Sequence, residues 1–347
     1  MRIAQVAPLY ESVPPQLYGG TERIVSYLTE NLVRRGHEVT LFASGDSETS
    51  ARLRPACPRA LRLDPSCQDQ LAPHVLMVEQ VAQEASEFDI VHYHIDYLHY
   101  PTTRRTPQRH VTTLHGRLDI PDLVPVYQEY RDMPLISISD AQRKPLSWAN
   151  WQATIHHGLP KDLYPFQEKP GGYLAFLGRV SREKGCDRAI DIARRVGAPL
   201  KIAAKIGEGD REFYESAIRP RLREPGIEFL GEIREHEKGL FLGGATALLF
   251  PIDWPEPFGL VMIESMACGT PVLAFPCGSV PEILEDGVTG RIGTSTEDLV
   301  RAVEEIGTID RRRCRETFER RFSDVRMVDD YEQIYHQMVE KDRSWTR

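Results

Sequence analysis

Short apolar segments alternate with amphipathic helical patterns along the whole chain, and this alternation restricts the fold more than any other feature. Repeated strand–helix–strand units are typical of parallel α/β sheets. The strands are expected at residues 3–7, 38–42, 90–94, 111–114, 135–138, 153–155, 173–177, 200–203, 227–230, 247–250 and 272–274. The helical patterns lie at residues 21–35, 70–86, 140–148, 187–196, 296–306, 311–321 and 325–339.

One stretch interrupts the alternation near the middle of the chain. Residues 158–172 contain proline and glycine but few apolar side chains, which is typical of a linker. A chain of 347 residues is long enough for two domains. The sequence therefore predicts two Rossmann-like domains, at residues 1–160 and 170–324. Ligands of such sheets gather at the carboxyl ends of the strands, so motifs that follow strands carry the most weight.

Composition excludes some classes of protein. A net charge of −8 argues against a nucleic-acid-binding protein, which usually presents a basic face. A local basic group, formed by Arg52, Arg54, Arg59 and Arg62, is interpreted as a solvated loop, with contact to anionic lipid as the alternative. The six cysteines include no Cys-x-x-Cys pair and are read as reduced thiols. With no apolar run of membrane-spanning length and no expected signal peptide, we predict a cytoplasmic protein, with peripheral membrane contact as the alternative.

Two glutamates stand eight positions apart in residues 255–264, which read Pro-Glu-Pro-Phe-Gly-Leu-Val-Met-Ile-Glu. Glu256 lies in a Pro/Gly turn, and Glu264 lies in an apolar run that is interpreted as a helix. If that helix starts near Phe258, Glu264 lies roughly 9 Å further along its axis. The backbone N–H groups expected to point out of its start belong to Gly259, Leu260 and Val261. Such groups form an anion site between the two carboxylates.

Two cations follow the first strand of the second domain. Residues 177–185 read Leu-Gly-Arg-Val-Ser-Arg-Glu-Lys-Gly and include Arg179 and Lys184. Fixed cations in this position can stabilise a phosphate leaving group without a metal ion. The alternative is a salt-bridged surface loop, because Arg182 and Glu183 stand between them.

Two motifs of the first domain also follow strands. Gly19 and Gly20 precede an amphipathic helix, where glycine lets a phosphate approach the helix N-terminus, although an ordinary helix start is the alternative. His115 ends the strand in Val-Thr-Thr-Leu-His-Gly, and a structural hydrogen bond is the alternative to a catalytic role there.

Taken together, these motifs resemble the retaining nucleotide-sugar glycosyltransferases of family 4 (group 1 type). The resemblance implies the GT-B fold, in which two Rossmann-like domains with parallel sheets face each other across a cleft, and in which a C-terminal helix, here 325–347, completes the first domain. It covers nearly the whole chain and is strongest from Gly178 to Gly290. The chain departs from the pattern at His156-His157-Gly158, where relatives usually have Asn-Gly, and at Lys205, where they often have a glycine-bearing turn.

The resemblance also implies roles for the motif residues. Glu264 would hold the donor ribose, Glu256 the sugar hydroxyls, and Arg179 with Lys184 the leaving diphosphate, while His115 would face the donor sugar from the other domain. The candidate catalytic residues are His115, Glu256, Arg179 and Lys184. The candidate donor-binding residues are Gly19, Gly20, Arg179, Lys184, Lys205, Glu232, Glu256, Phe258, Gly259, Leu260, Val261 and Glu264. Weaker candidates for acceptor binding are Tyr18, His94, Asp96 and Asp119.

No cofactor besides the nucleotide sugar is expected. His92 and His94 share one face of a strand and precede Asp96, but packing or pocket lining is favoured over a metal site there. The Asp-x-Asp motif of metal-dependent transferases is absent from the sequence.

The predicted activity is therefore transfer of a hexosyl group to an acceptor hydroxyl without a metal ion and with retained configuration. UDP-glucose is favoured as the commonest donor and GDP-mannose is the alternative. The acceptor, whether a small molecule, a glycan or a lipid-linked glycan, is left open. Two other functions are also left open: a nucleotide-sugar epimerase or hydrolase on the same fold, and a non-catalytic nucleotide-sugar-binding subunit.

Overall fold

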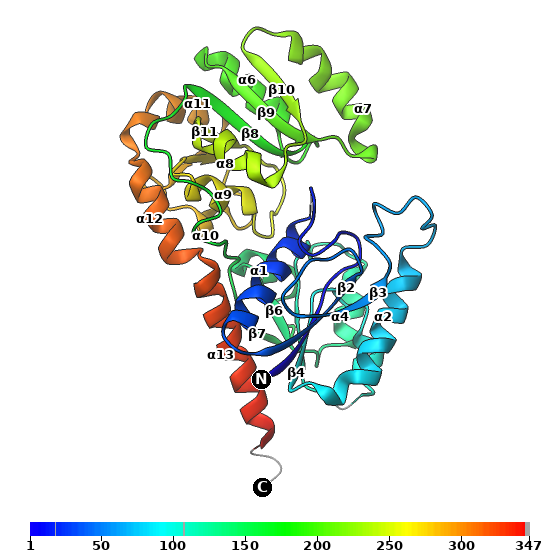
Figure 1. Ribbon diagram of the computed structural model, residues 1–347. Helices are drawn as coiled ribbons and strands as arrows, with labels where there is room; N and C mark the ends of the chain where they lie inside the picture. The colour runs from blue at the N-terminus through cyan, green and yellow to red at the C-terminus, as the bar shows by residue number, and fades with distance from the viewer. Residues whose placement is uncertain (18, 107, 344–347) are drawn as a thin grey trace. The chain divides into compact units, whose positions relative to one another are not determined.

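The chain forms two compact units, each built around its own parallel sheet (Figure 1). The computed structural model describes residues 1–17, 19–106 and 108–343. Unit 1 comprises Met1–Gly158 together with the chain from Asp324 onward, and unit 2 comprises Leu159–Ser323.

Unit 1 contains a seven-stranded sheet in the order β3-β2-β1-β4-β5-β6-β7. Every neighbouring pair of strands in it is parallel. The strands are β1 (Arg2–Val6), β2 (Glu38–Ser44), β3 (Arg52–Cys57), β4 (Ile90–Tyr93), β5 (His110–Thr113), β6 (Leu135–Ser137) and β7 (Trp151–Thr154). The helices are α1 (Gly20–Arg34), α2 (Leu71–Glu84), α3 (Tyr100–Thr103), α4 (Leu123–Glu129), α5 (Asp140–Arg143) and α13 (Asp324–Arg343).

Unit 2 contains a six-stranded sheet in the order β10-β9-β8-β11-β12-β13, again parallel throughout. The strands are β8 (Tyr173–Arg179), β9 (Leu200–Lys205), β10 (Ile227–Gly231), β11 (Ala245–Phe250), β12 (Val272–Ala274) and β13 (Gly290–Ile292). The helices are α6 (Cys186–Val196), α7 (Arg211–Phe213), α8 (Glu235–Gly243), α9 (Leu260–Ala267), α10 (Val280–Ile283), α11 (Thr296–Glu304) and α12 (Arg311–Arg321).

The central strands are apolar on both faces because helices cover both. Four of the five residues of β1 are buried, and the last four of β11 are buried as well. In unit 2, the apolar face of α6 packs with α11 over one face of the sheet, around Ile190 and Leu299. Continuous apolar strands of this kind are what a doubly wound parallel sheet requires. The α/β class with two Rossmann-like sheets, predicted from the sequence, is confirmed.

Each sheet reverses its strand order at one place. In unit 2 the chain winds outward from β8 to β10 and then returns to the other side of β8 with β11. In unit 1 the same reversal lies between β1 and β4. Loops diverge at such a point and leave room for a ligand at the carboxyl ends of the two strands. The loops that carry Arg179–Lys184 and residues 251–259 both start at this point of unit 2.

Several local expectations are wrong. The segment of Arg52 and Arg54 is not a loop but the edge strand β3. All four arginines of the basic group lie within 4.0 Å of a carboxylate, so their charges are compensated. The sequence did not predict β13, α4 or α8. Residues 158–172 were interpreted as a linker, but from Leu159 onward they belong to unit 2, where Leu159 and Tyr164 are buried.

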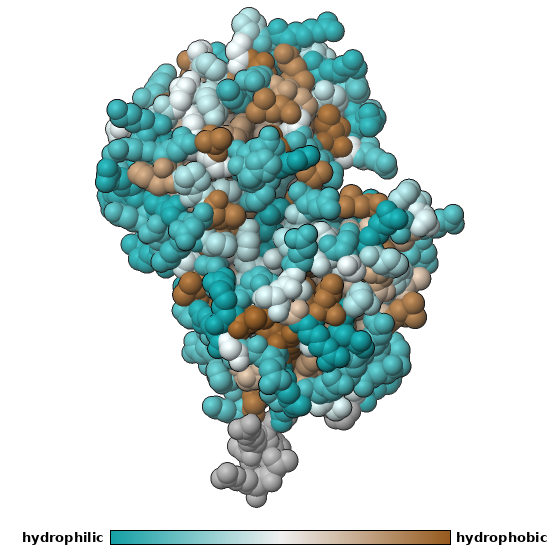
Figure 2. Space-filling view, in the orientation of Figure 1, coloured by the Kyte–Doolittle hydropathy of each residue, from teal (hydrophilic) through white to brown (hydrophobic). Residues whose placement is uncertain are grey.

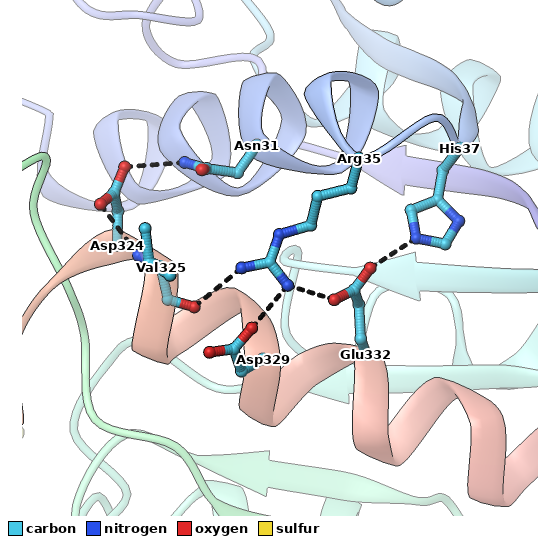
Figure 3. A network of polar contacts seen from close by, with 7 residues as sticks. All are labelled: Asn31, Arg35, His37, Asp324, Val325, Asp329 and Glu332. Atoms are coloured by element: carbon cyan, nitrogen blue, oxygen red, sulfur yellow. Dashed lines mark hydrogen bonds and ion pairs between the residues drawn. The ribbon is translucent and has the colours of Figure 1, made fainter.

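Helix α13 docks against α1 through a polar network (Figure 3). Arg35, which follows α1, donates to Asp329 at 2.6 Å, to Glu332, and to the carbonyl oxygen of Val325 at 3.1 Å. Glu332 also contacts the His37 ring at 2.6 Å. These contacts fix the register of α13 on unit 1, which matters because tyrosines of α13 reach the interior described below.

The face of the molecule shown in Figure 2 is mostly hydrophilic, with hydrophobic residues in small separate groups. Among the residues that the structure describes, no helix is both long enough and apolar enough to cross a membrane.

Candidate active site

Arg179 ends β8 at the reversal point of unit 2. Its Nη2 donates to Glu183 at 2.7 Å, and its Nε lies 3.3 Å from Asp210. About 42% of the side chain is exposed, so the guanidinium can still be reached from solvent. In the sheet register Arg179 is paired with Lys205 at the end of β9, which places two cationic residues side by side. The salt-bridged loop expected as the alternative is therefore present, and a phosphate ligand would have to compete with two carboxylates.

Lys184, Trp254 and Glu256 form a compact cluster that joins the two loops. Lys184 donates to Oε2 of Glu256, and its Nζ lies 4.4 Å from the centre of the Trp254 ring. The indole Nε1 of Trp254 donates to the same Oε2 at 3.0 Å. One oxygen of Glu256 thus accepts from both neighbours, while these contacts leave Oε1 for another donor.

A glycine supports Glu256 from behind. Gly278 has φ +58°, and a Cβ on it would lie 2.3 Å from both the backbone nitrogen and the backbone oxygen of Glu256. Next to it, Ser279 donates its N–H to Glu256 O at 3.0 Å and its hydroxyl to Phe258 O at 2.8 Å. The backbone of the Glu256 turn is therefore held against a segment that only glycine can form.

Helix α9 begins at Leu260, directly after this turn. Gly259 lies in the left-handed region with φ +79°, and the side chain of Phe258 is buried rather than directed to solvent. The first N–H groups of a helix have no partner within the helix and carry the positive end of its dipole. Helix α9 thus begins two residues after the predicted start near Phe258. The backbone N–H groups of Gly259, Leu260 and Val261 lie at its N-terminal end.

Glu264 lies on α9, almost fully buried, and is paired with a cation that the sequence did not indicate. Lys238 of α8 donates to its Oε1 at 2.8 Å and lies 3.2 Å from Glu235. Each of the two signature glutamates is therefore paired with one lysine from a different segment. Glu232 is exposed in the loop before α8, and no described contact joins it to this group.

His115 follows β5 in unit 1 and belongs to a group of histidines. Its Nε2 lies 2.9 Å from Nδ1 of His94, and its ring stacks on that of His157 at 5.3 Å. Burial lowers the pKa of His94 and His157 well below 6.5, so both rings are neutral at pH 7. His94 is buried, and its other ring nitrogen, Nε2, lies 2.9 Å from Oε1 of Gln5. His94 is therefore an interior partner of His115.

The glycine turn of unit 1 contains a buried acid. Gly20 begins α1, and a Cβ on Gly19 would lie 2.7 Å from Pro15. Glu22 lies buried in the first turn, and burial raises its pKa. A carboxylate at this helix start disfavours a phosphate there and favours a hydroxyl. Tyr18 lies outside the described residues.

The remaining acceptor candidates are separate surface features. Asp96 is exposed and adopts φ +51°. Asp119 accepts two hydrogen bonds from Arg117, at 2.7 and 2.8 Å, and this lowers its pKa. Neither residue contacts His115 in the described hydrogen bonds and ion pairs.

Comparison with known proteins matches both units. A profile described as Glycosyltransferase Family 4 matches residues 18–158, and one described as Glycosyl transferases group 1 matches residues 165–320. The chain belongs to glycosyltransferase family 4. This is a family of retaining nucleotide-sugar glycosyltransferases with the GT-B fold, so the resemblance read from the motifs is confirmed.

Full-length relatives of this family 4 chain include the N-acetyl-alpha-D-glucosaminyl L-malate synthase of Bacillus anthracis. It is 27% identical over 379 residues, which cover 94% of this chain and 96% of that protein. Four other curated relatives are matched over less than half of their own length: 45% of one, and 32% of each of the other three. Among solved structures, the sucrose-phosphate synthase of Thermosynechococcus elongatus has a TM-score of 0.80 at 18% identity, over 98% of this chain and 100% of that one. The structure of Anabaena HepE in complex with UDP-glucose has a TM-score of 0.71 at 19% identity, over 99% and 100% of the two chains.

The described part of this family 4 chain holds no group of three or more His, Cys, Asp and Glu side chains arranged to bind a metal ion. His92 and His94 are instead hydrogen-bonded to Tyr335, Thr113, His115 and Gln5. The packing interpretation of this histidine pair, favoured from the sequence, is consistent with these contacts.

Sequence reasoning missed two residues of unit 2 and two residues of unit 1. Trp254 stood two positions before Glu256 and could have been noticed as the aromatic residue of the same turn. Lys238 carried no signal, since it lies in the mixed-charge stretch Glu-His-Glu-Lys. Gln5 and Tyr335, which contact the histidine group from β1 and α13, stand 330 positions apart.

Proposed function

We propose that this protein transfers a hexosyl group from a nucleotide diphosphate sugar to an acceptor hydroxyl, with retention of anomeric configuration and without a metal ion. One observation carries this proposal: each signature glutamate is paired with a lysine. Glu256 is paired with Lys184 just before α9, and Glu264 is paired with Lys238 within α9. Two carboxylates and a helix N-terminus at the reversal point of a parallel sheet suit a ligand with hydroxyls and phosphates.

Unit 2 would bind the donor. The N–H groups at the start of α9, together with Arg179, Lys184 and Lys205, would hold the diphosphate, and the cations would stabilise the charge that develops on the leaving phosphate. Glu264 would accept from a ribose hydroxyl. Glu256 would accept from a hydroxyl of the sugar through the oxygen that Lys184 and Trp254 do not use.

Unit 1 would be the acceptor-side domain. His115 would face the sugar, and the Gly19–Gly20 turn with Glu22 would meet a hydroxyl rather than a phosphate. His94 would act through His115, while Asp96, Asp119 and Tyr18 are weaker proposals for acceptor contact.

In the proposed reaction, the bond between the sugar C1 and the phosphate oxygen breaks, and a bond from C1 to the acceptor oxygen forms on the same face. The proton of the acceptor hydroxyl passes to the leaving phosphate oxygen. Nucleoside diphosphate and the glycosylated acceptor are the products. Arg179 and Lys184 lower the barrier because their charges are in place before the leaving group becomes negative.

UDP-glucose is the favoured donor, and the UDP-glucose complex of HepE, a protein of the same fold, supports testing it first. GDP-mannose is the alternative. A thermal-shift screen with UDP-, GDP- and ADP-sugars, with and without magnesium, discriminates between them, because a ligand of the native state raises the melting temperature. A shift that needs magnesium would contradict the metal-independent site.

Measurements of the transfer rate test the proposed roles of these residues. Arg179→Ala is expected to lower kcat by about 100-fold, the scale of removing one group that stabilises developing charge. Arg182→Ala is the matched control, because Arg182 stands on the loop that follows Arg179 and its guanidinium lies 4.9 Å from the centre of the Phe213 ring of α7. Full rate in both Arg179→Ala and Glu264→Ala would exclude this site. Donor binding without transfer to any acceptor would favour a non-catalytic subunit, and release of free or epimerised sugar would favour a hydrolase or epimerase.

A further inference from the structure

A continuous chain of hydrogen bonds runs through the interior of unit 1 from His115 to α13. His115 Nε2 meets His94 Nδ1 at 2.9 Å, and His94 Nε2 meets Gln5 Oε1 at 2.9 Å. Gln5 Nε2 donates to the Tyr335 hydroxyl at 3.1 Å, which meets His92 Nδ1 at 2.6 Å.

The chain continues past His92 to a second tyrosine. His92 Nε2 meets the Thr113 hydroxyl at 2.7 Å, and Thr113 meets the Tyr331 hydroxyl at 3.1 Å. Gln5, His92, His94, Thr113 and both tyrosines are buried. Water therefore does not compete for these bonds.

The donor and acceptor roles along this chain follow from the orientation of the Gln5 amide, because the hydroxyls and the neutral histidine rings can each donate and accept. Burial lowers the pKa of His92 and His94 well below 6.5, so each ring carries one N–H, donates through one nitrogen and accepts through the other. Gln5 turns its amide NH₂ to Tyr335 and its oxygen to His94. The proton of the Tyr335 hydroxyl is then directed to His92.

The roles of the His115 nitrogens follow from those of His94. Because Gln5 Oε1 can only accept, His94 must donate through Nε2 and accept through Nδ1. His115 must then donate through its Nε2. In the neutral ring its Nδ1 is left without a proton, and that atom is buried and has no hydrogen-bond partner among the described residues.

We propose that Tyr335 of α13 is a positioning residue which, through Gln5 and His94, holds His115 in the Nε2–H tautomer and so keeps Nδ1 as an acceptor for a substrate hydroxyl. If the amide of Gln5 were reversed, every bond between Tyr335 and His115 would reverse, and Nδ1 of His115 would carry a proton. The orientation of one buried amide therefore decides whether this side of the site accepts or donates.

The tautomer can be read directly from ¹⁵N chemical shifts of the histidine rings in the full-length protein without substrate. We expect His115 to show a pyridine-like Nδ1 and a pyrrole-like Nε2. In Tyr335→Phe the amide of Gln5 loses its acceptor and can turn, so the two nitrogens of His115 should move toward averaged shifts. His99, whose ring is bonded to Thr103 and Thr112 instead, serves as the internal reference.

Tyr331→Phe is the matched control. It also removes one buried hydroxyl from α13, but its contact with Thr113 lies beyond His92 and does not touch Gln5. The tautomer of His115 should stay as in the wild type. Combining Gln5→Glu with Tyr335→Phe should restore it, because a carboxylate accepts from His94 in either orientation.

A pyrrole-like Nδ1 on His115 in the wild type would overturn the proposal, and so would unchanged His115 shifts in Tyr335→Phe. The expected effect on turnover, a fall in kcat/KM of about 10-fold for Tyr335→Phe and none for Tyr331→Phe, rests on the proposed function of His115. The two failures are distinguishable. Full activity of His115→Ala would remove that role and leave the tautomer assignment intact.

Discussion

Lys238 donates to Glu264 at 2.8 Å and so ties α8 to α9 through an ion pair in which Glu264 is almost fully buried and 17% of the Lys238 side chain is exposed. Lys184 pairs with Glu256 in the same way from the loop after β8. Both signature carboxylates are therefore compensated before any ligand arrives. A buried carboxylate with one oxygen held by a lysine keeps a fixed orientation, and its charge does not repel a diphosphate as strongly as a lone carboxylate would.

Removing the carboxylate of Glu264 should destabilise the protein, because Lys238 would lose its contact at 2.8 Å with this carboxylate, while its contact with Glu235 at 3.2 Å remains. We expect Glu264→Ala to lower the free energy of unfolding by about 2–3 kcal/mol, less than the cost of about 3–5 kcal/mol for a fully buried pair because Lys238 is partly exposed. Chemical denaturation measures this. Glu228→Ala is the control, since its pair with Lys201 is about half exposed and should contribute less than about 1 kcal/mol. Equal losses in the two variants would contradict the buried-pair account.

Gly278 should be intolerant of any side chain. A Cβ there would lie 2.3 Å from the backbone of Glu256, and φ +58° would add strain of about 1–3 kcal/mol. We expect Gly278→Ala to displace the Glu256 turn, lowering stability by at least about 2 kcal/mol and weakening nucleotide-sugar binding measured by calorimetry. Gly307→Ala is the control, because a Cβ at Gly307 would meet no atom within 4 Å. A Gly278→Ala protein with wild-type affinity would show that the turn tolerates displacement.

The fold was predictable because its signal is local. The pattern of each apolar strand and each long amphipathic helix is visible within a few residues, so the strands from β8 to β12 were predicted with errors of at most two residues at either end. Strand β3 was missed because an edge strand that alternates arginine with apolar residues looks like a loop. Strand β13 was missed because three residues ending a glycine turn are too short to show a period.

The site was predictable only where the chemistry lies within one motif. Arg179, Lys184, Glu256 and Glu264 each stand in a recognisable stretch. Lys238 stands 26 positions before Glu264, and the spacing of charges gives no reason to join them. The contact between Gln5 and Tyr335 depends on the docking of α13 on unit 1, which is a tertiary property.

The buried histidines should make unit 1 sensitive to mild acid. Burial lowers the pKa of His92, His94, His99 and His157 well below 6.5. Between those values and pH 6.5 the unfolded chain binds more protons than the folded one, so stability is complete above pH 6.5 and is lost as pH falls. We expect a loss of at least about 2 kcal/mol between pH 7 and pH 5, the contribution of one such histidine.

Two carboxyl groups act in the opposite direction in the same range. Desolvation raises the pKa of Glu22, and it raises the pKa of Asp96 to about 6, so the folded chain holds these two protons more tightly than the unfolded chain as pH falls. Four histidines should outweigh two carboxyls. Denaturant unfolding at pH 7, 6 and 5 checks the sign, and equal or greater stability at pH 5 would mean that the histidines are not held neutral.

The attachment of α13 should depend more on its buried contact than on its exposed ones (Figure 3). Asn31 of α1 donates to Asp324 at 2.8 Å, where both residues are buried, so Asn31→Ala leaves a carboxylate oxygen of Asp324 without this donor and without water. We expect a loss of about 1–3 kcal/mol and faster amide hydrogen exchange along α13. Arg2→Ala is the control, because it removes an ion pair with Asp89 that is partly exposed and includes no residue of α13, with an expected cost below about 1 kcal/mol. If exchange in α13 were unchanged in Asn31→Ala, the buried bond would not hold the helix. The polar contacts of Arg35, which salt screens, would then carry the attachment, and exchange would accelerate with ionic strength.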